Sequence, residues 1–223
     1  MIELRDAVYG YTGKVLLSGI SLTLPPGSFH FLTGPSGSGK TTFLKLCYGE
    51  LRPTSGVLSI LGEDLSRLTR DQMAVMRRRI GVVHQDCEFL DHLPLAENVA
   101  LPLILADRPV AEGDLTELLA WVGLRSRASA FPPELSGGER QRGALARAIV
   151  AAPDIILADE PTGNLDWEMS QRLLSLLIEL NRMGKTILVA THDLNLIRTA
   201  KSQVAARVLR IKDRQVQLAG ADL

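Results

Sequence analysis

The chain has 223 residues, of which 46% are hydrophobic and 22% are charged. This balance is typical of a folded globular protein and excludes a disordered chain, a collagen-like fibre and a disulfide-stabilised scaffold. Lys+Arg and Asp+Glu number 25 each, so the formal net charge is zero, and we expect no nucleic-acid partner.

Short strand-like runs alternate with helical runs along the chain. The first part predicts strands at residues 1–8, 20–24 and 28–33, a helix at 41–48, a strand at 56–60, a helix at 71–79 and a strand at 80–83. The last part predicts helices at residues 139–150, 167–182 and 194–200, strands at 155–158 and 186–190, and a hairpin at 208–218. This alternation predicts an α/β fold with a mostly parallel sheet, helices on both faces and ligands beyond the carboxyl ends of the strands.

The middle of the chain has a different pattern. Between residues 94 and 130, apolar residues recur near helical spacing and strand signals are few. We therefore expect a helical subdomain at about residues 94–135, inserted into the α/β core of a single domain that spans residues 1–223.

A glycine-rich run follows the predicted strand at 28–33 and opens the next helix, which is the context of a phosphate-binding loop. Glycines let backbone N–H groups close around phosphate oxygens, and the helix N-terminus adds positive potential. Lys40 supplies a full charge, and the hydroxyl of Thr41 is a ligand for Mg²⁺. The residues of this expected nucleotide site are Gly34, Pro35, Ser36, Gly37, Ser38, Gly39, Lys40, Thr41 and Thr42.

Two carboxylates end the apolar run at residues 155–158, a pattern that describes a buried strand delivering acids to its carboxyl end. Asp159 is placed to hold Mg²⁺ directly or through water. Glu160 is expected near the outer phosphate, where it can polarise an attacking water as a general base.

A second anion site is predicted at Ser136, Gly137 and Gly138, which open another helix. Ser136 followed three residues later by Glu139 is also a capping box. Both interpretations can hold at once. A capping box explains Ser136 and Glu139 but gives no reason for two glycines, so the anion site is favoured.

These motifs together resemble those of the ATP-binding subunits of ABC transporters, and the resemblance covers about residues 2–215. The run Leu135-Ser136-Gly137-Gly138-Glu139 resembles the family's signature motif. By this resemblance Gln85 contacts Mg²⁺ and the attacking water, and His192 contacts the γ-phosphate. The resemblance also implies ATP and Mg²⁺ as ligands, and a phosphate-loop ATPase fold with an antiparallel β part at its N-terminus.

Two further site residues are implied by the same resemblance. Asp166, in the run Gly163-Asn164-Leu165-Asp166, matches a loop at the family's dimer interface. Tyr11 matches the aromatic residue that stacks on adenine, although Tyr9 is close enough to leave the assignment open.

The resemblance implies a head-to-tail homodimer in the ATP-bound state, in which Ser136, Gly137, Gly138 and Glu139 of one copy cover the ATP held by the other. It also implies a separate integral membrane subunit, which docks on the helical insertion and on the loop after Gln85. We expect Phe89, Leu90, Leu93 and Leu95 to help form that dock, or alternatively to belong in part to the core.

Residues beyond the shared motifs are most similar to the branch of the family that acts in bacterial cell division, on the cytoplasmic face of the inner membrane. The run at residues 158–166 is shared with the lipoprotein-releasing and MacB-type branches, which remain alternatives. A soluble ABC ATPase of DNA repair or translation is another alternative, but the chain has no room for a long coiled coil and carries a single such domain.

The remaining reactive residues are expected to have structural roles. His84 and His92 lack the spacing of a metal site, and the basic run at residues 77–79 is typical of a solvated helix end. Cys47 and Cys87 have no CxxC spacing and predict small buried apolar side chains. No signal peptide or membrane-spanning run is recognised, so we expect the chain to fold in a reducing cytoplasm.

Overall fold

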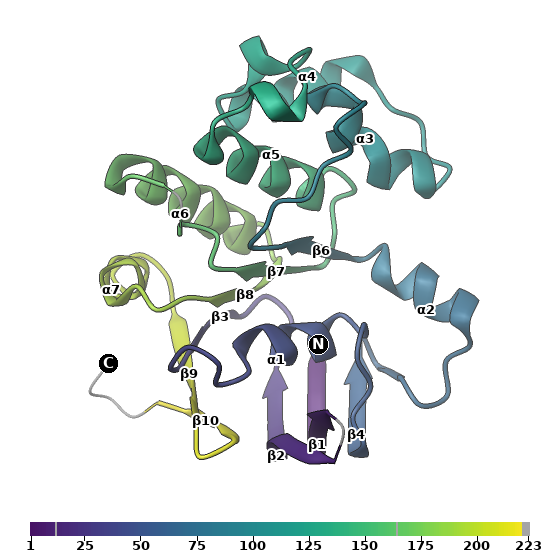
Figure 1. Ribbon diagram of the computed structural model, residues 1–223, viewed down its shortest axis with the longest axis vertical. Helices are drawn as coiled ribbons and strands as arrows, with labels where there is room; N and C mark the ends of the chain where they lie inside the picture. Colours follow the sequence, from purple (N-terminus) through teal and green to yellow (C-terminus); the bar gives the residue numbers. More distant parts are fainter. Residues whose placement is uncertain (12, 164, 220–223) are drawn as a thin grey trace.

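The computed structural model describes residues 1–11, 13–163 and 165–219. Its N-terminal part is an antiparallel sheet with the strand order β2-β1-β4-β5. In Figure 1 this sheet lies in the lower part of the molecule. Its strands are β1 (Ile2–Tyr11), β2 (Lys14–Leu24), β4 (Ser55–Ile60) and β5 (Glu63–Asp64).

The second sheet has the strand order β10-β9-β3-β8-β7-β6. All its neighbouring strands are parallel except the edge pair β9 and β10. Its strands are β3 (Phe29–Thr33), β6 (Ile80–Val83), β7 (Ile155–Asp159), β8 (Thr186–Ala190), β9 (Ala206–Lys212) and β10 (Gln215–Leu218). Every residue of β3, β7 and β8 is buried, which explains their continuous apolar runs.

Helices cover both faces of this sheet. Helix α1 (Lys40–Cys47) lies between the two sheets, where its apolar side chains join the core formed by β1, β2, β4, β7 and β8. On the opposite face lie α5 (Gly137–Ile149), α6 (Trp167–Arg182) and α7 (Leu194–Lys201), which bury a second core against β3, β7 and β8. Helix α2 (Arg70–Arg77) precedes the edge strand β6.

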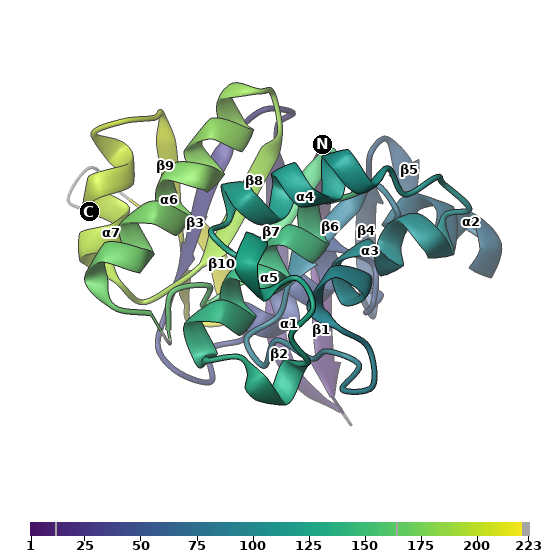
Figure 2. The same cartoon turned by 90° about the horizontal axis from the view of Figure 1, so that it is seen from above.

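A third layer covers α5. Helices α3 (Leu95–Leu105) and α4 (Glu112–Trp121) pack on α5 and are followed by two short 3₁₀ turns, Arg125–Arg127 and Pro132–Glu134. Figure 2 looks onto this layer from above. Leu95, Val99, Leu119, Val122 and Ala146 are among the buried residues of its own apolar cluster.

The structure differs from the sequence predictions at a few boundaries. Strand β2 begins at Lys14 rather than at residue 20, because its first half pairs with the end of β1 through a register shift that interrupts simple alternation. Strand β5 has two residues and leaves no periodic signal. Helix α5 begins at Gly137 because the Ser136 side chain caps it.

Both cysteines are buried and neither forms a disulfide in the part of the chain that the structure describes. In these same residues, no helix combines the length and the apolar character that crossing a bilayer requires.

One buried titratable residue lies away from the strand ends. His30 in β3 is 1% exposed and pairs in register with Arg207 of β9. Burial, with a smaller contribution from the positive charge of Arg207, lowers the pKa of His30 to about 4. The folded protein therefore holds this ring neutral where an unfolded chain would protonate it.

His30 is predicted to make the protein less stable as the pH falls. The unfolded state binds the proton below about pH 6.5 and the folded state does not, so stability is lost between about pH 6.5 and 4. Between pH 7 and 4.5 the wild type should lose about 2–3 kcal/mol more unfolding free energy than His30→Gln. Urea unfolding measures this difference. His92→Gln, a change at an exposed histidine, is the control, and equal pH dependence of wild type and His30→Gln contradicts the assignment.

Candidate functional site

The site lies where parallel strands end at the same edge of the sheet. β3, β8, β7 and β6 are neighbours, so the loops that follow them meet there. A backbone bond from Glu160 N to Ala190 O, 2.9 Å long, joins the end of β7 to the end of β8. This bond brings residues 160 and 192 together although 32 positions separate them.

The loop after β3 turns into α1 through glycines. Gly39 is the N-cap of α1 with φ 103°, in the left-handed region that favours glycine. Gly34 lies against β9, and a Cβ built on it would be 2.7 Å from Ser38 Oγ and 3.2 Å from Ile211 Cβ. The backbone conformation of this loop therefore requires glycine at positions 34 and 39.

The first residues of α1 face the end of β7. The Thr41 hydroxyl donates to Asp159 Oδ2 over 2.6 Å. Burial raises the pKa of Asp159, and the negative charge of Glu160 adds to this effect. The Thr41 hydrogen bond and the Lys40 ammonium oppose the rise. A cation bound beside Asp159 would therefore be electrostatically favourable, because it would stabilise the ionised carboxylate.

Glu160, Lys40 and His192 form a second polar group beside Asp159. Glu160 Oε1 lies 3.0 Å from His192 Nδ1 and 4.0 Å from Lys40 Nζ. Glu160 has φ 46°, a left-handed conformation that is unusual for a residue with a Cβ and is often found at functional sites. Lys40 Nζ also donates to Gly34 O over 3.0 Å, which keeps the ammonium close to the loop.

His192 is held by the entry into α7. Asp193 caps this helix, with Oδ1 accepting from Asn195 N and Leu196 N over 2.8 and 3.1 Å. The His192 side chain itself is 78% exposed, whereas that of Glu160 is 14% exposed. The pair therefore presents one partly buried acid and one accessible imidazole to the same space.

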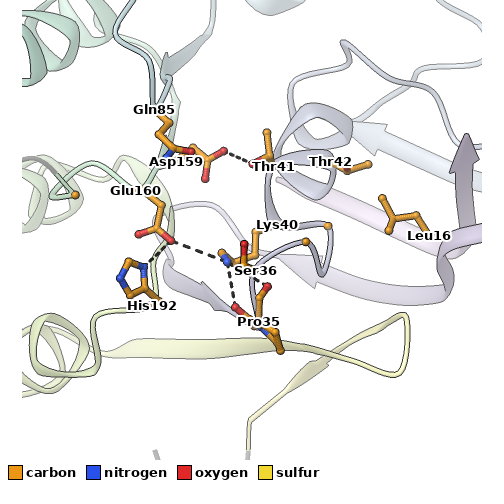
Figure 3. Close-up of a pocket in the computed structure, with 14 residues that line it drawn as sticks. Leu16, Pro35, Ser36, Lys40, Thr41, Thr42, Gln85, Asp159, Glu160 and His192 are labelled. Atoms are coloured by element: carbon orange, nitrogen blue, oxygen red, sulfur yellow. Dashed lines mark hydrogen bonds and ion pairs between the residues drawn. The ribbon is translucent and has the colours of Figure 1, made fainter.

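These groups surround a cavity of about 730 Å³, shown in Figure 3. Its volume is in the range of small-molecule sites. Most of the predicted site residues line it: Gly34, Pro35, Ser36, Gly37, Gly39, Lys40, Thr41, Thr42, Gln85, Asp159, Glu160 and His192. Leu16 and Gly163 line it too and were not among the predicted site residues. An apolar strand residue such as Leu16 carries no specific signal, and Gly163 was named only within the run that matches the dimer-interface loop.

The oxygen-bearing side chains of this cavity suit Mg²⁺. Thr41 offers a hydroxyl, Asp159 a carboxylate and Gln85 an amide, and oxygen ligands of this kind are those that Mg²⁺ takes. In the described ranges no cluster of three or more His, Cys, Asp or Glu could hold a metal alone. A magnesium ion here would complete its shell with phosphate oxygens and water, as it commonly does in nucleotide sites.

The second predicted anion site is separate from this cavity. Ser136 caps α5: its Oγ accepts from Glu139 N over 3.2 Å, and Glu139 Oε2 accepts from Ser136 N over 2.8 Å. These bonds are a capping box, and the bond from Ser136 N is the first cause of the lowered pKa of Glu139. Ser136 and Gly137 are exposed, and Ser136, Gly137, Gly138 and Glu139 do not line the cavity.

Asp166 and Ser38, two other predicted site residues, also lie outside the cavity lining. Asp166 caps α6 by accepting from Met169 N over 2.8 Å, and Asn164 lies outside the described residues. Ser38 lines a neighbouring pocket, and its buried Oγ has no hydrogen-bond partner in the described part of the chain.

The two tyrosines that compete for the adenine differ in exposure. Tyr9 is 8% exposed, whereas Tyr11 is 48% exposed, and their rings meet edge to face with centroids 5.0 Å apart. Only Tyr11 therefore offers an open ring face, although it does not line the cavity.

The structure divides the four residues expected at the dock for a membrane subunit between the core and the surface. Leu95 is fully buried in the cluster under α3, so it is a core residue. Phe89 is half-buried and its ring carries the Arg147 guanidinium at 4.6 Å. Leu93 is half-buried, and Leu90 is 45% exposed. Of the four residues, Leu90 is the most exposed and therefore the most accessible to a partner.

Comparison with known proteins places the chain in a family. A family model described as ABC transporter matches residues 17–163. The chain is 44% identical over 219 residues to the cell division ATP-binding protein FtsE of Escherichia coli K12, with 96% of each chain covered. It is 43% identical over 209 residues to the FtsE protein of Bacillus subtilis strain 168, with 92% of each chain covered.

Solved structures agree with this placement. The ATP-binding cassette MJ0796, solved as a dimer in a post-hydrolysis state with ADP and Pi, matches with a TM-score of 0.87 and 35% identity, and 97% of each chain is covered. The predicted α/β phosphate-loop fold, the family resemblance and the similarity to its cell-division branch are confirmed. The chain belongs to the ABC transporter family, as an ATPase subunit of the ABC type.

Proposed function

We propose that this ATPase is the ATP-hydrolysing subunit of a bacterial cell-division complex. Similarity to FtsE proteins over most of both chains supports this role. Its partner is an integral membrane subunit of the FtsX type, so the protein acts on the cytoplasmic face of the inner membrane at the division site. There ATP hydrolysis is coupled to the control of cell-wall hydrolases.

The chemistry we assign is the attack of water on the γ-phosphorus of ATP. Glu160 accepts a proton from that water as the water oxygen bonds to the γ-phosphorus, and the bond from the γ-phosphorus to the bridging oxygen breaks. The products are inorganic phosphate and ADP, whose phosphate charge faces Lys40 and the loop N–H groups. The observation that carries this assignment is the placement of Glu160 Oε1 between His192 Nδ1 and Lys40 Nζ, at 3.0 and 4.0 Å, on the wall of the cavity formed by the glycine-rich loop.

The neighbouring residues have supporting roles in this proposal. His192 orients Glu160 and contacts the γ-phosphate, and Gln85 orients the water. Thr41, Asp159 and Gln85 would hold Mg²⁺, which when bound neutralises charge on the phosphates. Tyr11 stacks on the adenine, because its ring is exposed whereas that of Tyr9 is buried.

The site is completed by a second copy of the chain. Ser136, Gly137, Gly138 and Glu139 lie outside the cavity of their own chain, and Ser136 and Gly137 are exposed. A head-to-tail pair lets this helix N-terminus meet the γ-phosphate held by the other copy, with Asp166 at the interface. The dimeric form of the similar cassette supports this arrangement. ATP then stabilises the pair, and hydrolysis releases it.

Glu160→Gln is predicted to bind ATP and not to hydrolyse it. The amide cannot accept the proton of water, so turnover should fall at least about 100-fold while ATP affinity is kept. With ATP the variant should run as a dimer in size-exclusion chromatography with light scattering. Glu168→Gln, the same change at an exposed helix position, is the control and should behave as the wild type. Hydrolysis within a few-fold of wild type by Glu160→Gln overturns the assigned base.

Leu90→Asp is predicted to weaken attachment to the membrane subunit and to spare ATP binding. The Leu90 backbone is held by Asn98 through bonds of 2.8 and 3.0 Å, so the exposed side chain can change without moving the loop. Recovery of the membrane partner with tagged Glu160→Gln protein should fall about tenfold when Leu90→Asp is added. Leu218→Asp, at another exposed leucine, is the control.

The identity of the recovered partner tests the cell-division role itself. Recovery of an FtsX-type protein agrees with it. Recovery of a lipoprotein-releasing permease keeps the chemistry and contradicts the role, and recovery of soluble proteins alone contradicts the membrane assignment.

A further inference from the structure

The loop that carries Gln85 is fastened to α5 by a buried hydrogen bond. Cys87 Sγ donates to Gln141 Oε1 over 3.0 Å. Both residues are buried, with exposed fractions of 5% and 1%. Gln141 lies in the second turn of α5, the helix that begins with the exposed Gly137 turn. The bond therefore joins the loop that carries Gln85 to α5, the helix that Ser136 caps.

The backbone of Cys87 adopts an unusual conformation in a tight turn. Its φ is 44°, in the left-handed region that a residue with a Cβ seldom adopts. Cys87 N donates to His84 O over 3.3 Å, which closes a tight turn around Gln85. Such a conformation persists only where surrounding contacts hold it.

The chemical state of the thiol suits the donor role. A cysteine S–H can donate to an amide oxygen. Cys87 Sγ also lies 3.5 Å from His84 O, so the bond to Gln141 Oε1 is the shorter of its two contacts.

The Gln141 amide, which accepts the bond from Cys87, has an unpaired nitrogen. Gln141 Nε2 is buried and has no hydrogen-bond partner among the described residues. The bond from Cys87 is thus the contact that orients the Gln141 amide. Its loss would leave the buried amide oxygen unpaired as well, which is unfavourable.

A second contact fastens the same loop two turns further along α5. The Arg147 guanidinium lies 4.6 Å from the centroid of the Phe89 ring. Gly143 lies between these attachments, and a Cβ built there would be 3.2 Å from Phe89 Cζ. The absence of a side chain at 143 lets the loop lie close against the helix.

We propose that Cys87 is a positioning residue for ATP hydrolysis: its hydrogen bond to Gln141 fixes the turn that places Gln85 in the cavity and makes that placement depend on the position of α5. Cys87 lines neither the main cavity nor the smaller pocket beside it that Gln85 also lines, so it acts through Gln85 and not on ATP itself. This inference rests on the proposed hydrolysis reaction and adds a residue to it.

Cys47 supplies a matched control for the loss of a buried thiol. It is fully buried in the apolar core under α1, and no hydrogen bond of its Sγ is found in the structure described here. Cys47→Ala and Cys87→Ala each remove one buried sulfur, but only the second removes a hydrogen bond to α5.

The test compares Cys87→Ala, Cys87→Ser and Cys47→Ala. Cys87→Ala should lower kcat for ATP hydrolysis about tenfold and leave KM for ATP within about twofold, because orientation of the water is lost and nucleotide binding is not. Cys87→Ser keeps a donor and should restore kcat to within about threefold of wild type. Cys47→Ala should keep wild-type kcat.

Amide hydrogen exchange gives a readout that does not depend on activity. Residues 84–90 should exchange faster in Cys87→Ala than in Cys47→Ala, and Cys87→Ser should resemble wild type. Unchanged kcat in Cys87→Ala, or equal loss of kcat in its alanine and serine variants, overturns the proposal. If the wild type hydrolyses no ATP, the proposed function fails, and equal exchange of residues 84–90 in the two alanine variants then overturns the inference separately.

Discussion

The parallel register of β3, β8, β7 and β6 is the constraint on which the site depends. Each strand delivers one chemical group to the same edge: the phosphate loop, His192, the acid pair and Gln85. Because the strands are neighbours, groups from positions 34 to 192 meet around one cavity. The bond from Glu160 N to Ala190 O extends this register by one residue past the end of β7. Without that register the same side chains would not share a surface.

The electrostatics of the cavity follow from burial at this edge. Two adjacent carboxylates, Asp159 and Glu160, lie beside one ammonium, Lys40, and burial raises the pKa of Asp159. A cation near Thr41 and Asp159 would offset that unfavourable desolvation, while the loop N–H groups and Lys40 favour phosphate. The cavity therefore combines a place for metal and a place for anion, which is the requirement of a magnesium–nucleotide complex.

Local motifs could be predicted from the sequence, and contacts between distant segments could not. The phosphate loop and the capping box at Ser136 and Glu139 are local, since their geometry is set within a few residues. The choice between Tyr9 and Tyr11 was not predictable, because a register shift between β1 and β2 after Tyr9 breaks the alternation of faces. For Leu95 the sequence left a dock and the core as alternatives, because an apolar surface residue and an apolar core residue look alike in sequence, and the structure places it in the core.

The helix N-terminus at Ser136 lies outside the chain's own cavity, so the role proposed for it requires a second copy. The most direct measurement mixes two inactive variants, Lys40→Ala and Ser136→Asp. Aspartate keeps the helix cap, and its charge repels the γ-phosphate. A mixed dimer has one intact composite site, so the mixture should recover about a quarter of wild-type ATP hydrolysis, while each variant alone stays inactive. A mixture as inactive as its components would contradict a site shared between two copies.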